Sequence, residues 1–376
     1  MTLKISASFD SGAIEMVSSA RADDIQVAIR ADSHAEFRQW FYFRLQGAAE
    51  QLCRLRFVNA GKCTYVDGWR DYRVVASYDR RDWFRVPTRF DGAEMVVEHT
   101  PQRDSIYYAY FEPYSWERHL DLLGSVAQSP RVRVRDIGSS LEGRDMSLVT
   151  VGSPEAAKRP IWIIARQHPG ETMAEWFVEG LLERLVDTSD PVARALLASA
   201  VVHVVPNMNP DGSVRGNLRT NAAGANLNRE WLAPSAEYSP EVLCVREAMR
   251  ESGVGAFLDV HGDEALPYVF ADGCERLPEF SADDLARQQA FIAAFKRASP
   301  DFQDVHGYPS NKDTKVNLTL ASKYVGNTFG CLSLTLELPF KDNADWPDAA
   351  AGWSGQRSKR LGAAAVEPLL AMVPRL

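Results

Sequence analysis

The sequence predicts an α/β protein of two domains: an antiparallel β-sandwich over residues 1–112 and an α/β domain over residues 113–376. Three observations lead to this prediction. The chain has 376 residues, and single hydrophobic cores usually stop growing at roughly 250–300 residues. Short apolar runs dominate the first third of the chain, whereas helical periodicity begins only after Pro113. The 9 Trp, 12 Tyr and 17 Phe residues exclude a disordered chain.

Apolar runs of strand length recur through the first domain. Turn sequences such as Asp91-Gly92 separate them, and this spacing is typical of an antiparallel sandwich of about seven strands. A β-rich extension of one large domain is the alternative. The predicted strands are residues 3–8, 25–29, 41–45, 53–58, 73–77, 94–98 and 106–110.

In the second domain, buried strands alternate with long helical segments. The near-continuous apolar content of four runs indicates strands that are covered on both faces; they are residues 161–165, 201–205, 256–260 and 331–336. Apolar residues at helical spacing predict helices at residues 114–127, 172–186, 240–251, 282–298 and 352–372. The ligand crevice of such a domain lies at the carboxyl ends of its strands, so functional residues are expected there.

Charge and cysteine content exclude several classes of protein. A net charge of −8 argues against nonspecific nucleic-acid binding, which needs surplus Lys and Arg. The five cysteines include no CxxC pair, so neither a disulfide framework nor a thiolate zinc site is indicated. No apolar run reaches about 18 residues, and the first segment contains Asp10 and Glu15 where a signal peptide would be apolar. We therefore predict a cytoplasmic protein that binds neither nucleic acid nor membranes.

Two histidines and a glutamate stand just beyond predicted strands. His168 and Glu171 are separated by a Pro-Gly turn, and such a turn can aim an imidazole and a carboxylate at one point, as zinc requires. His261 follows another strand of the same predicted sheet. HxxE pairs also arise by chance, and His261 with Glu264 is a second one. Structural histidines and a helix-capping turn are therefore the alternative.

The most polar stretch of the chain runs from Pro206 to Trp231. Arg215, Arg219 and Arg229 stand there among Asn and Gly residues. A guanidinium presents a fixed fork of donors, so these arginines favour a site for a carboxylate or an oxyanion. A surface loop held by Asx turns is the alternative.

Six motifs together resemble the zinc metallocarboxypeptidases and, within them, the bacterial type of the cytosolic carboxypeptidase subgroup. They are HPGE at 168–171, NPDG at 209–212, GNLR at 216–219, NLNREW at 226–231, DVHG at 259–262 and TLELPF at 335–340. The resemblance covers roughly residues 115–376 and implies a mixed sheet between helical layers, an α/β/α zinc carboxypeptidase domain. An N-terminal β-sandwich is typical of the subgroup, and YFEPYSWERHL at 110–120 is similar to its junction.

The resemblance implies a metal centre and a general base. It makes His168, Glu171 and His261 the ligands of one zinc ion per chain, with water in the open position, and makes Glu337 the general base and acid. The chemistry agrees, because zinc lowers the pKa of a bound water to about 7 and a nearby carboxylate can then take its proton. A strand-end glutamate paired with Lys341 is the alternative for Glu337.

The resemblance also implies how a peptide would be bound. Arg219 would stabilise the oxyanion of the scissile carbonyl, and Asn228 and Arg229 would bind the terminal carboxylate. The family usually has a substrate-binding Tyr about twenty residues before the base. This chain departs from that pattern: Tyr308 and Tyr324 are the two candidates, and the alternative is that neither serves; of the two we assign Tyr324.

These roles predict a zinc-dependent carboxypeptidase that acts on the C-terminal tails of peptides or proteins. A cluster of Lys312, Lys315 and Lys323 precedes the base and favours acidic C-terminal residues, Glu or Asp, with Lys323 as the assigned contact; a solvated face is the alternative. Two other functions stay open, a zinc-dependent deacylase of N-acyl amino acids and an inactive protein-binding module. All catalytic candidates lie between His168 and Glu337, so we expect none from the first domain.

Overall fold

The first part of the chain forms two five-stranded sheets in the computed structural model, which describes residues 3–153, 155, 158–309 and 315–376. The strand orders are β1-β4-β10-β6-β7 and β2-β3-β5-β9-β8. Phe43 of β4 and Phe41, just before that strand, pack against Phe57 of the other sheet, with ring centroids 6.2 and 4.7 Å away. The strands are β1 (Lys4–Ser6), β2 (Glu15–Arg21), β3 (Asp24–Ala28), β4 (Tyr42–Gln46), β5 (Cys53–Phe57), β6 (Val75–Ser77), β7 (Trp83–Arg85), β8 (Thr88–Phe90), β9 (Met95–His99) and β10 (Ser105–Ala109).

The predicted sandwich is therefore confirmed, with three additional strands and one exception to its antiparallel pairing. All seven predicted strands are present, but β2, β7 and β8 were not predicted. β2 is mostly exposed, and β7 and β8 have only three residues each, so none carries a clear apolar alternation. β3 and β5 pair in parallel, because the chain crosses to the other sheet between them.

A seven-stranded mixed sheet forms the centre of the second domain, in the order β11-β12-β14-β13-β15-β17-β16. The four predicted buried strands are its middle: β14, β13, β15 and β17 pair in parallel. The outer strands β11, β12 and β16 pair antiparallel and were not predicted: β11 is half-buried or exposed, Ser147 and Thr150 interrupt the apolar run of the buried β12, and β16 has only three residues. The strands are β11 (Val132–Ser139), β12 (Asp145–Val151), β13 (Arg159–Ala165), β14 (Ala200–Val205), β15 (Ala256–Asp263), β16 (Phe270–Asp272) and β17 (Leu332–Pro339).

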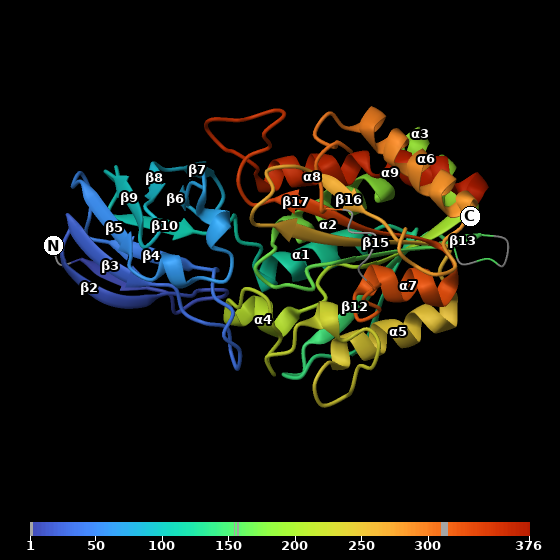
Figure 1. Cartoon of the computed structure of the whole chain (residues 1–376), viewed down its shortest axis with the longest axis horizontal. Coiled ribbons are helices and arrows are strands. Elements are labelled where there is room, and N and C mark those ends of the chain that lie inside the picture. The colour runs from blue at the N-terminus through green and yellow to red at the C-terminus, as the bar shows by residue number, and fades with distance from the viewer. Residues whose placement is uncertain (1–2, 154, 156–157, 310–314) are drawn as a thin grey trace.

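Helices cover both faces of this sheet. Ile161 and Ile163 of β13 belong to a core with α2 and α8, whereas Trp162 and Ile164 belong to a second core with α5 and α7. Figure 1 shows α6, α8 and α9 on one side of the sheet and α5 and α7 on the other. This is the predicted α/β/α arrangement. The helices are α1 (Trp116–Val126), α2 (Met173–Val186), α3 (Pro191–Ser199), α4 (Pro210–Arg215), α5 (Pro240–Ser252), α6 (Ala282–Ala298), α7 (Ala321–Phe329), α8 (Gly355–Ala364) and α9 (Val366–Met372).

The predicted helix at residues 352–372 is two helices, α8 and α9, with a break at Ala365. Pro368 has no N–H to donate to the preceding turn, so one continuous helix is not formed. The short helices α3, α4 and α7 were not predicted. Within the part of the chain that the structure describes, no helix is both long and apolar enough to cross a membrane.

The two domains lie side by side (Figure 1) and share one hydrophobic core, which runs without interruption from the sandwich to one face of the large sheet. At their boundary, the rings of Tyr110 and Phe340 stack with centroids 4.5 Å apart. Phe340 immediately follows β17, the strand that carries Glu337. The first domain therefore packs against the functional end of the sheet.

Candidate metal centre and its crevice

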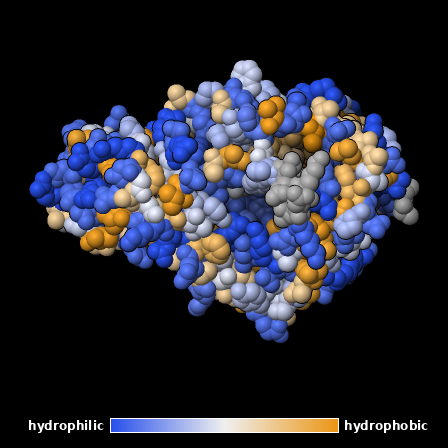
Figure 2. Space-filling view, in the orientation of Figure 1, coloured by the Kyte–Doolittle hydropathy of each residue, from blue (hydrophilic) through white to orange (hydrophobic). Residues whose placement is uncertain are grey.

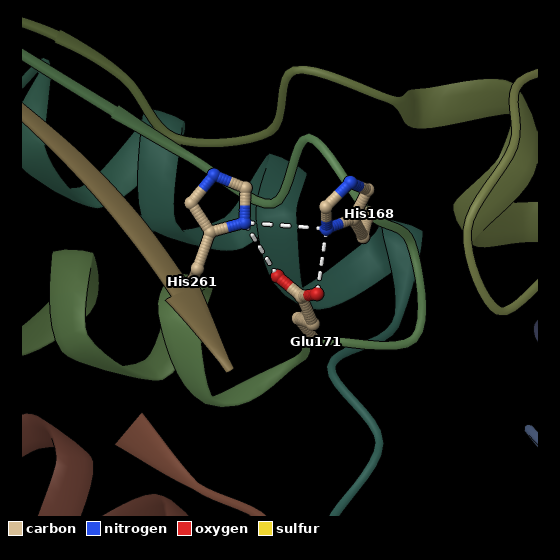
Figure 3. Close-up of side chains that lie close together, drawn as sticks. All are labelled: His168, Glu171 and His261. Carbon is tan, nitrogen blue, oxygen red and sulfur yellow. Dashed lines mark hydrogen bonds and ion pairs between the residues drawn. The ribbon is translucent and has the colours of Figure 1, made fainter. Parts of the chain in front are cut away.

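His168, Glu171 and His261 lie together at the carboxyl ends of two neighbouring strands. β13 and β15 are adjacent, with Ala165 opposite Val260, so the residues that follow them meet at one edge of the sheet. The Nδ1 atoms of the two histidines are 3.2 Å apart. Glu171 lies between them, with Oε1 2.6 Å from His168 Nδ1 and Oε2 2.8 Å from His261 Nδ1. Figure 3 shows all three side chains pointing toward one another.

The turn that carries His168 is fixed by its neighbours. Arg166 has a left-handed backbone, with φ of 59°, and its buried guanidinium donates to the Pro169 carbonyl and to Glu175, at 2.9 and 2.7 Å. The Gly170 N–H donates to the Leu218 carbonyl at 2.8 Å. A Cβ at position 170 would lie 3.0 Å from that carbonyl oxygen, so a glycine allows the close approach of the two loops.

The outer nitrogen of each histidine has its own hydrogen-bonding partner. His261 Nε2 lies 2.9 Å from Asp259 Oδ2, and His168 Nε2 lies 3.0 Å from Asn226 Oδ1. Such contacts fix the tautomer and turn Nδ1 inward, as is usual for histidines that bind metals. Two imidazole nitrogens and a carboxylate, all buried, are the donor set of a zinc site that keeps one position open. The residues present therefore fit a zinc ion.

The pKa values of the cluster reflect close packing of charges. Burial lowers the pKa of His168 to about 3, and Arg219 acts in the same direction. Burial opposes the charge on His261, but Asp259 and Glu171 outweigh it and raise its pKa. Burial also opposes the charge on Glu171, yet the two histidines hold its pKa well below the usual range. The cluster thus presents an ionised carboxylate between two imidazoles.

Glu337 lies on the next strand, directly opposite His261 in the pairing of β15 and β17. Burial raises the pKa of its carboxyl to about 8, against the opposing effect of His261. The Tyr308 hydroxyl lies 3.0 Å from Glu337 Oε1 and 2.9 Å from Asp263 Oδ2. Glu337 Oε2 is buried and has no hydrogen-bonding partner among the described residues. A buried carboxyl with a free oxygen is suited to exchanging a proton with a ligand.

Arg219, Asn228 and Arg229 come from the polar loop that follows α4. Asn228 Nδ2 lies 3.3 Å from His261 Nε2, and the Arg229 guanidinium donates to the Asn228 carbonyl at 2.6 Å. The Arg219 guanidinium lies over the rings of two first-domain residues, Phe37 and Tyr65. In the space-filling view, hydrophilic residues gather over the middle of this face of the molecule (Figure 2).

Two assigned contacts, Tyr324 and Lys323, lie away from this arrangement. The Tyr324 ring lies 4.4 Å under the Arg246 guanidinium, and its hydroxyl lies 3.3 Å from Arg250. The tyrosine that reaches Glu337 is Tyr308 instead. Tyr324 lies within α7 and Tyr308 in the loop before it, and only the tertiary structure shows which of the two reaches Glu337.

The Lys323 side chain is 3% exposed and its ammonium pairs with Asp272 at 2.7 Å, so that its charge is neutralised. Of the other two lysines of the predicted cluster, Lys315 lines a cavity together with Tyr308. Lys312 lies outside the described residues. Lys323 therefore adds no net positive charge to the predicted cluster of three lysines.

Several residues of the site were not foreseen in the sequence. Gln167 donates to Asp259 at 2.8 Å and accepts from the Trp231 indole at 2.8 Å, which ties the loop of the first histidine to that of the second. Glu264 is buried, and burial raises its pKa well above the usual range. The only signal for Glu264 was the second HxxE pattern, which we attributed to chance.

Comparisons with known proteins found two family models and several solved structures that match the chain. A model of the cytosolic carboxypeptidase N-terminal domain matches residues 5–111, and the zinc carboxypeptidase model matches residues 120–349. A metallo-carboxypeptidase from Burkholderia cenocepacia is 58% identical with a TM-score of 0.97, and each chain covers 99% of the other. A metallo-carboxypeptidase from Pseudomonas aeruginosa is 44% identical with a TM-score of 0.96, over 99% of each chain.

Curated sequences are also similar to the chain. An uncharacterized protein from Zymomonas mobilis is 46% identical over 100% of this chain and 98% of its own length. Human cytosolic carboxypeptidase 4 is 28% identical over 72% of this chain, which covers only 29% of that longer protein.

Proposed function

The chain belongs to the zinc carboxypeptidase family and is a metallocarboxypeptidase, and from that premise we propose that it releases C-terminal residues from peptides or proteins with one zinc ion per chain. The observation that carries the proposal is the convergence of His168, Glu171 and His261 on one point, beside the buried carboxyl of Glu337. When bound, zinc supplies a Lewis acid that polarises a carbonyl and acidifies water.

In this proposal Glu337 moves the proton. It takes a proton from the attacking water and passes it to the leaving amine. We assign this role to Glu337 because its Oε2 is buried without another partner among the described residues. Tyr308 holds Oε1 at 3.0 Å, which fixes the direction of the carboxyl group.

The arginines bind the substrate. Arg219 donates to the oxyanion that develops on the scissile carbonyl, and Asn228 and Arg229 hold the terminal carboxylate, since a guanidinium forms paired hydrogen bonds with a carboxylate. A site that requires a free carboxylate acts only on chain ends. The Pseudomonas aeruginosa relative was crystallised with (2-guanidinoethylmercapto)succinic acid, a ligand that itself carries carboxylates.

A preference for C-terminal Glu or Asp is the finer part of the proposal. Lys315 lines the cavity beside Tyr308, and Arg276 lines the same cavity. The carboxylates of Asp272, Glu275 and Asp304 line it as well, so an acidic side chain would be held by direct pairing with Lys315 or Arg276 and not by a net positive charge. Lys323 contributes little, because Asp272 neutralises it.

Two further assignments belong to this proposal. We set the domain boundary between residues 112 and 113, in the segment between β10 and α1. We also propose that the enzyme acts in the cytoplasm, because its first part matches the model of the cytosolic carboxypeptidase N-terminal domain.

The test uses matched peptides that end in Glu, Leu or Lys, with the released amino acid measured before and after treatment with a chelator. We expect release from free C-termini, none from amidated ones, loss of activity with the chelator and recovery with added zinc. Activity that survives removal of the metal would contradict the zinc assignment. Faster release of Leu or Lys than of Glu would contradict the acidic preference. Hydrolysis of N-acyl amino acids with peptides left intact would favour the deacylase.

A further inference from the structure

The loop that carries Arg219 is held in place by the first domain. The Ser11 N–H donates to the Val214 carbonyl at 3.0 Å, and the Ser33 N–H donates to Asn217 Oδ1 at 3.0 Å. Gly216 has φ of 67°, and a Cβ there would lie 2.6 Å from the Ser11 carbonyl oxygen. The two segments are therefore in direct contact along their backbones.

Asp32 makes the central contact of this interface. Its carboxylate accepts from three successive backbone N–H groups, those of Leu218, Arg219 and Thr220, at 2.5, 2.8 and 2.9 Å. The Thr220 hydroxyl donates to the same carboxylate at 3.0 Å. Asp32 is only 7% exposed, and hydrogen bonds from N–H groups to a buried carboxylate are strong. The backbone conformation at Arg219 thus depends on a side chain of the other domain.

The Arg219 side chain also lies against the first domain. Its guanidinium carbon is 5.8 Å from the centre of the Phe37 ring and 5.6 Å from that of Tyr65. Arginine stacks favourably on such rings. The Asp32 N–H donates to the Phe37 carbonyl at 2.8 Å, so the residue that holds the Arg219 backbone and a ring that holds its guanidinium belong to one closed loop.

We propose that Asp32, together with Phe37 and Tyr65, is a positioning residue for Arg219, so that the first domain contributes to the catalytic site. The inference rests on the proposed role of Arg219 at the oxyanion. An oxyanion donor is effective only when it is held in place before the reaction, and a free arginine side chain has many rotamers. The first domain removes that freedom from both the backbone and the guanidinium.

The first test is Asp32→Asn in the full chain, which replaces one acceptor oxygen with a donor group. We expect kcat to fall about tenfold, as a small displacement of a catalytic group does, with KM within about twofold and bound zinc unchanged. A tenfold rise in KM with unchanged kcat would contradict positioning of an oxyanion donor.

A double-mutant cycle with Arg219→Ala separates positioning from a general effect on folding. Arg219→Ala alone should lower kcat about 100-fold or more. If Asp32 acts through Arg219, Asp32→Asn should cause no further loss in the Arg219→Ala background. An equal loss in both backgrounds would overturn the proposal. Should Asp32→Asn not fold, Phe37→Leu takes its place in the same cycle with the same expected outcomes.

Asp91→Asn is the matched control, because Asp91 also lies in the first domain and also accepts from two backbone N–H groups, at 2.9 and 2.8 Å. It makes no contact with the second domain in the described structure, so its kcat should equal that of the wild type. Assays of the wild-type enzyme beside Asp32→Asn distinguish the proposed function from the proposed positioning of Arg219. No C-terminal release by the wild type would contradict the proposed function, whereas normal release by Asp32→Asn would contradict only the positioning.

Discussion

The two histidines of the centre differ from Glu337, the proposed general base, in what their removal should do. His168 directs Nδ1 into the cluster and Nε2 to Asn226 at 3.0 Å, whereas Glu337 lies on the neighbouring strand without being one of the three clustered groups. Metal binding and proton transfer are therefore assigned to separable side chains.

Glu337→Gln should keep about one equivalent of zinc per chain and lose at least about 100-fold in kcat, because only the proton carrier is removed. His168→Ala should lose metal and activity together, since one of three ligands is gone. Metal analysis of both purified variants, with peptide hydrolysis measured in parallel, checks the pair. Stoichiometric zinc in His168→Ala, or near wild-type activity in Glu337→Gln, would contradict these roles.

Glu112 is a buried carboxyl at the junction of the domains whose pKa burial raises to about 7 from a usual value of 4.5. The folded state therefore holds this proton more tightly than the unfolded state. The stabilising effect is complete below about pH 4.5 and is lost as the pH rises to about 7. Glu112→Gln should thus gain up to about 3 kcal/mol over the wild type at pH 8 and little at pH 4.5.

Urea denaturation at the two pH values measures this difference. The exposed Glu237 offers a control, because Glu237→Gln should follow the wild type at both pH values. An equal effect of Glu112→Gln at pH 4.5 and pH 8 would show that ionisation of Glu112 is not the cause.

Among the elements, the contact between α2 and α8 depends on two glycines. A Cβ at Gly180 would lie 2.0 Å from the Lys359 carbonyl oxygen, and one at Gly362 would lie 1.9 Å from the Phe177 carbonyl oxygen. The helices therefore touch backbone to backbone. This contact supports α2, whose N-terminus follows Glu171 directly.

Gly180→Ala should lower the free energy of unfolding by at least about 2 kcal/mol, because the added methyl group forces the two helices apart. Gly124→Ala in α1 is the control, since nothing lies within 4 Å of a Cβ at that position. It should stabilise the protein by about 0.5–1 kcal/mol, the usual advantage of Ala over Gly in a helix. Equal effects of the two changes in urea denaturation would contradict close packing of α2 and α8.

Strands with a nearly continuous apolar run could be predicted from the sequence, whereas most others could not, including the largely buried β12, in which Ser147 and Thr150 interrupt the run. The strands β13, β14, β15 and β17 are buried along nearly their whole length, so their composition identifies them. Edge strands such as β11 and three-residue strands such as β7 are stabilised by pairing with a neighbour. Their own residues therefore carry little signal.

At the scale of the whole molecule, a buried arginine joins the two domains, in addition to their shared hydrophobic core. Arg85 of β7 donates through Nη2 to the carbonyls of Phe340 and Trp353, each at 2.9 Å, and of Lys341 at 3.1 Å. Burial lowers the pKa of this guanidinium, and the carbonyl groups of the second domain satisfy its donors. The contact lies just beyond the strand that carries Glu337.

Arg85→Met should destabilise the protein by about 3 kcal/mol, because three buried carbonyls of the second domain lose their donor. Arg89→Met is the matched control: Arg89 lies on β8, the next strand along the chain, and is exposed, with a 3.7 Å contact to Glu98 as its ion pair among the described residues. Its effect should stay within about 0.5 kcal/mol. Urea denaturation of both variants measures the difference, and similar values would show that Arg85 does not join the domains.

The sequence by itself determined the two-domain α/β architecture, the family and the metal cluster, because buried strands and six ordered motifs are local patterns. The tertiary structure decided what depends on distant segments meeting: that Tyr308 rather than Tyr324 reaches Glu337, that Asp272 neutralises Lys323, and that Arg219 lies against the first domain. The sequence predicted no catalytic contribution from that domain. Its contacts with Arg219 join residues nearly 190 positions apart, and no local pattern records such a distance, because packing alone brings the two loops together.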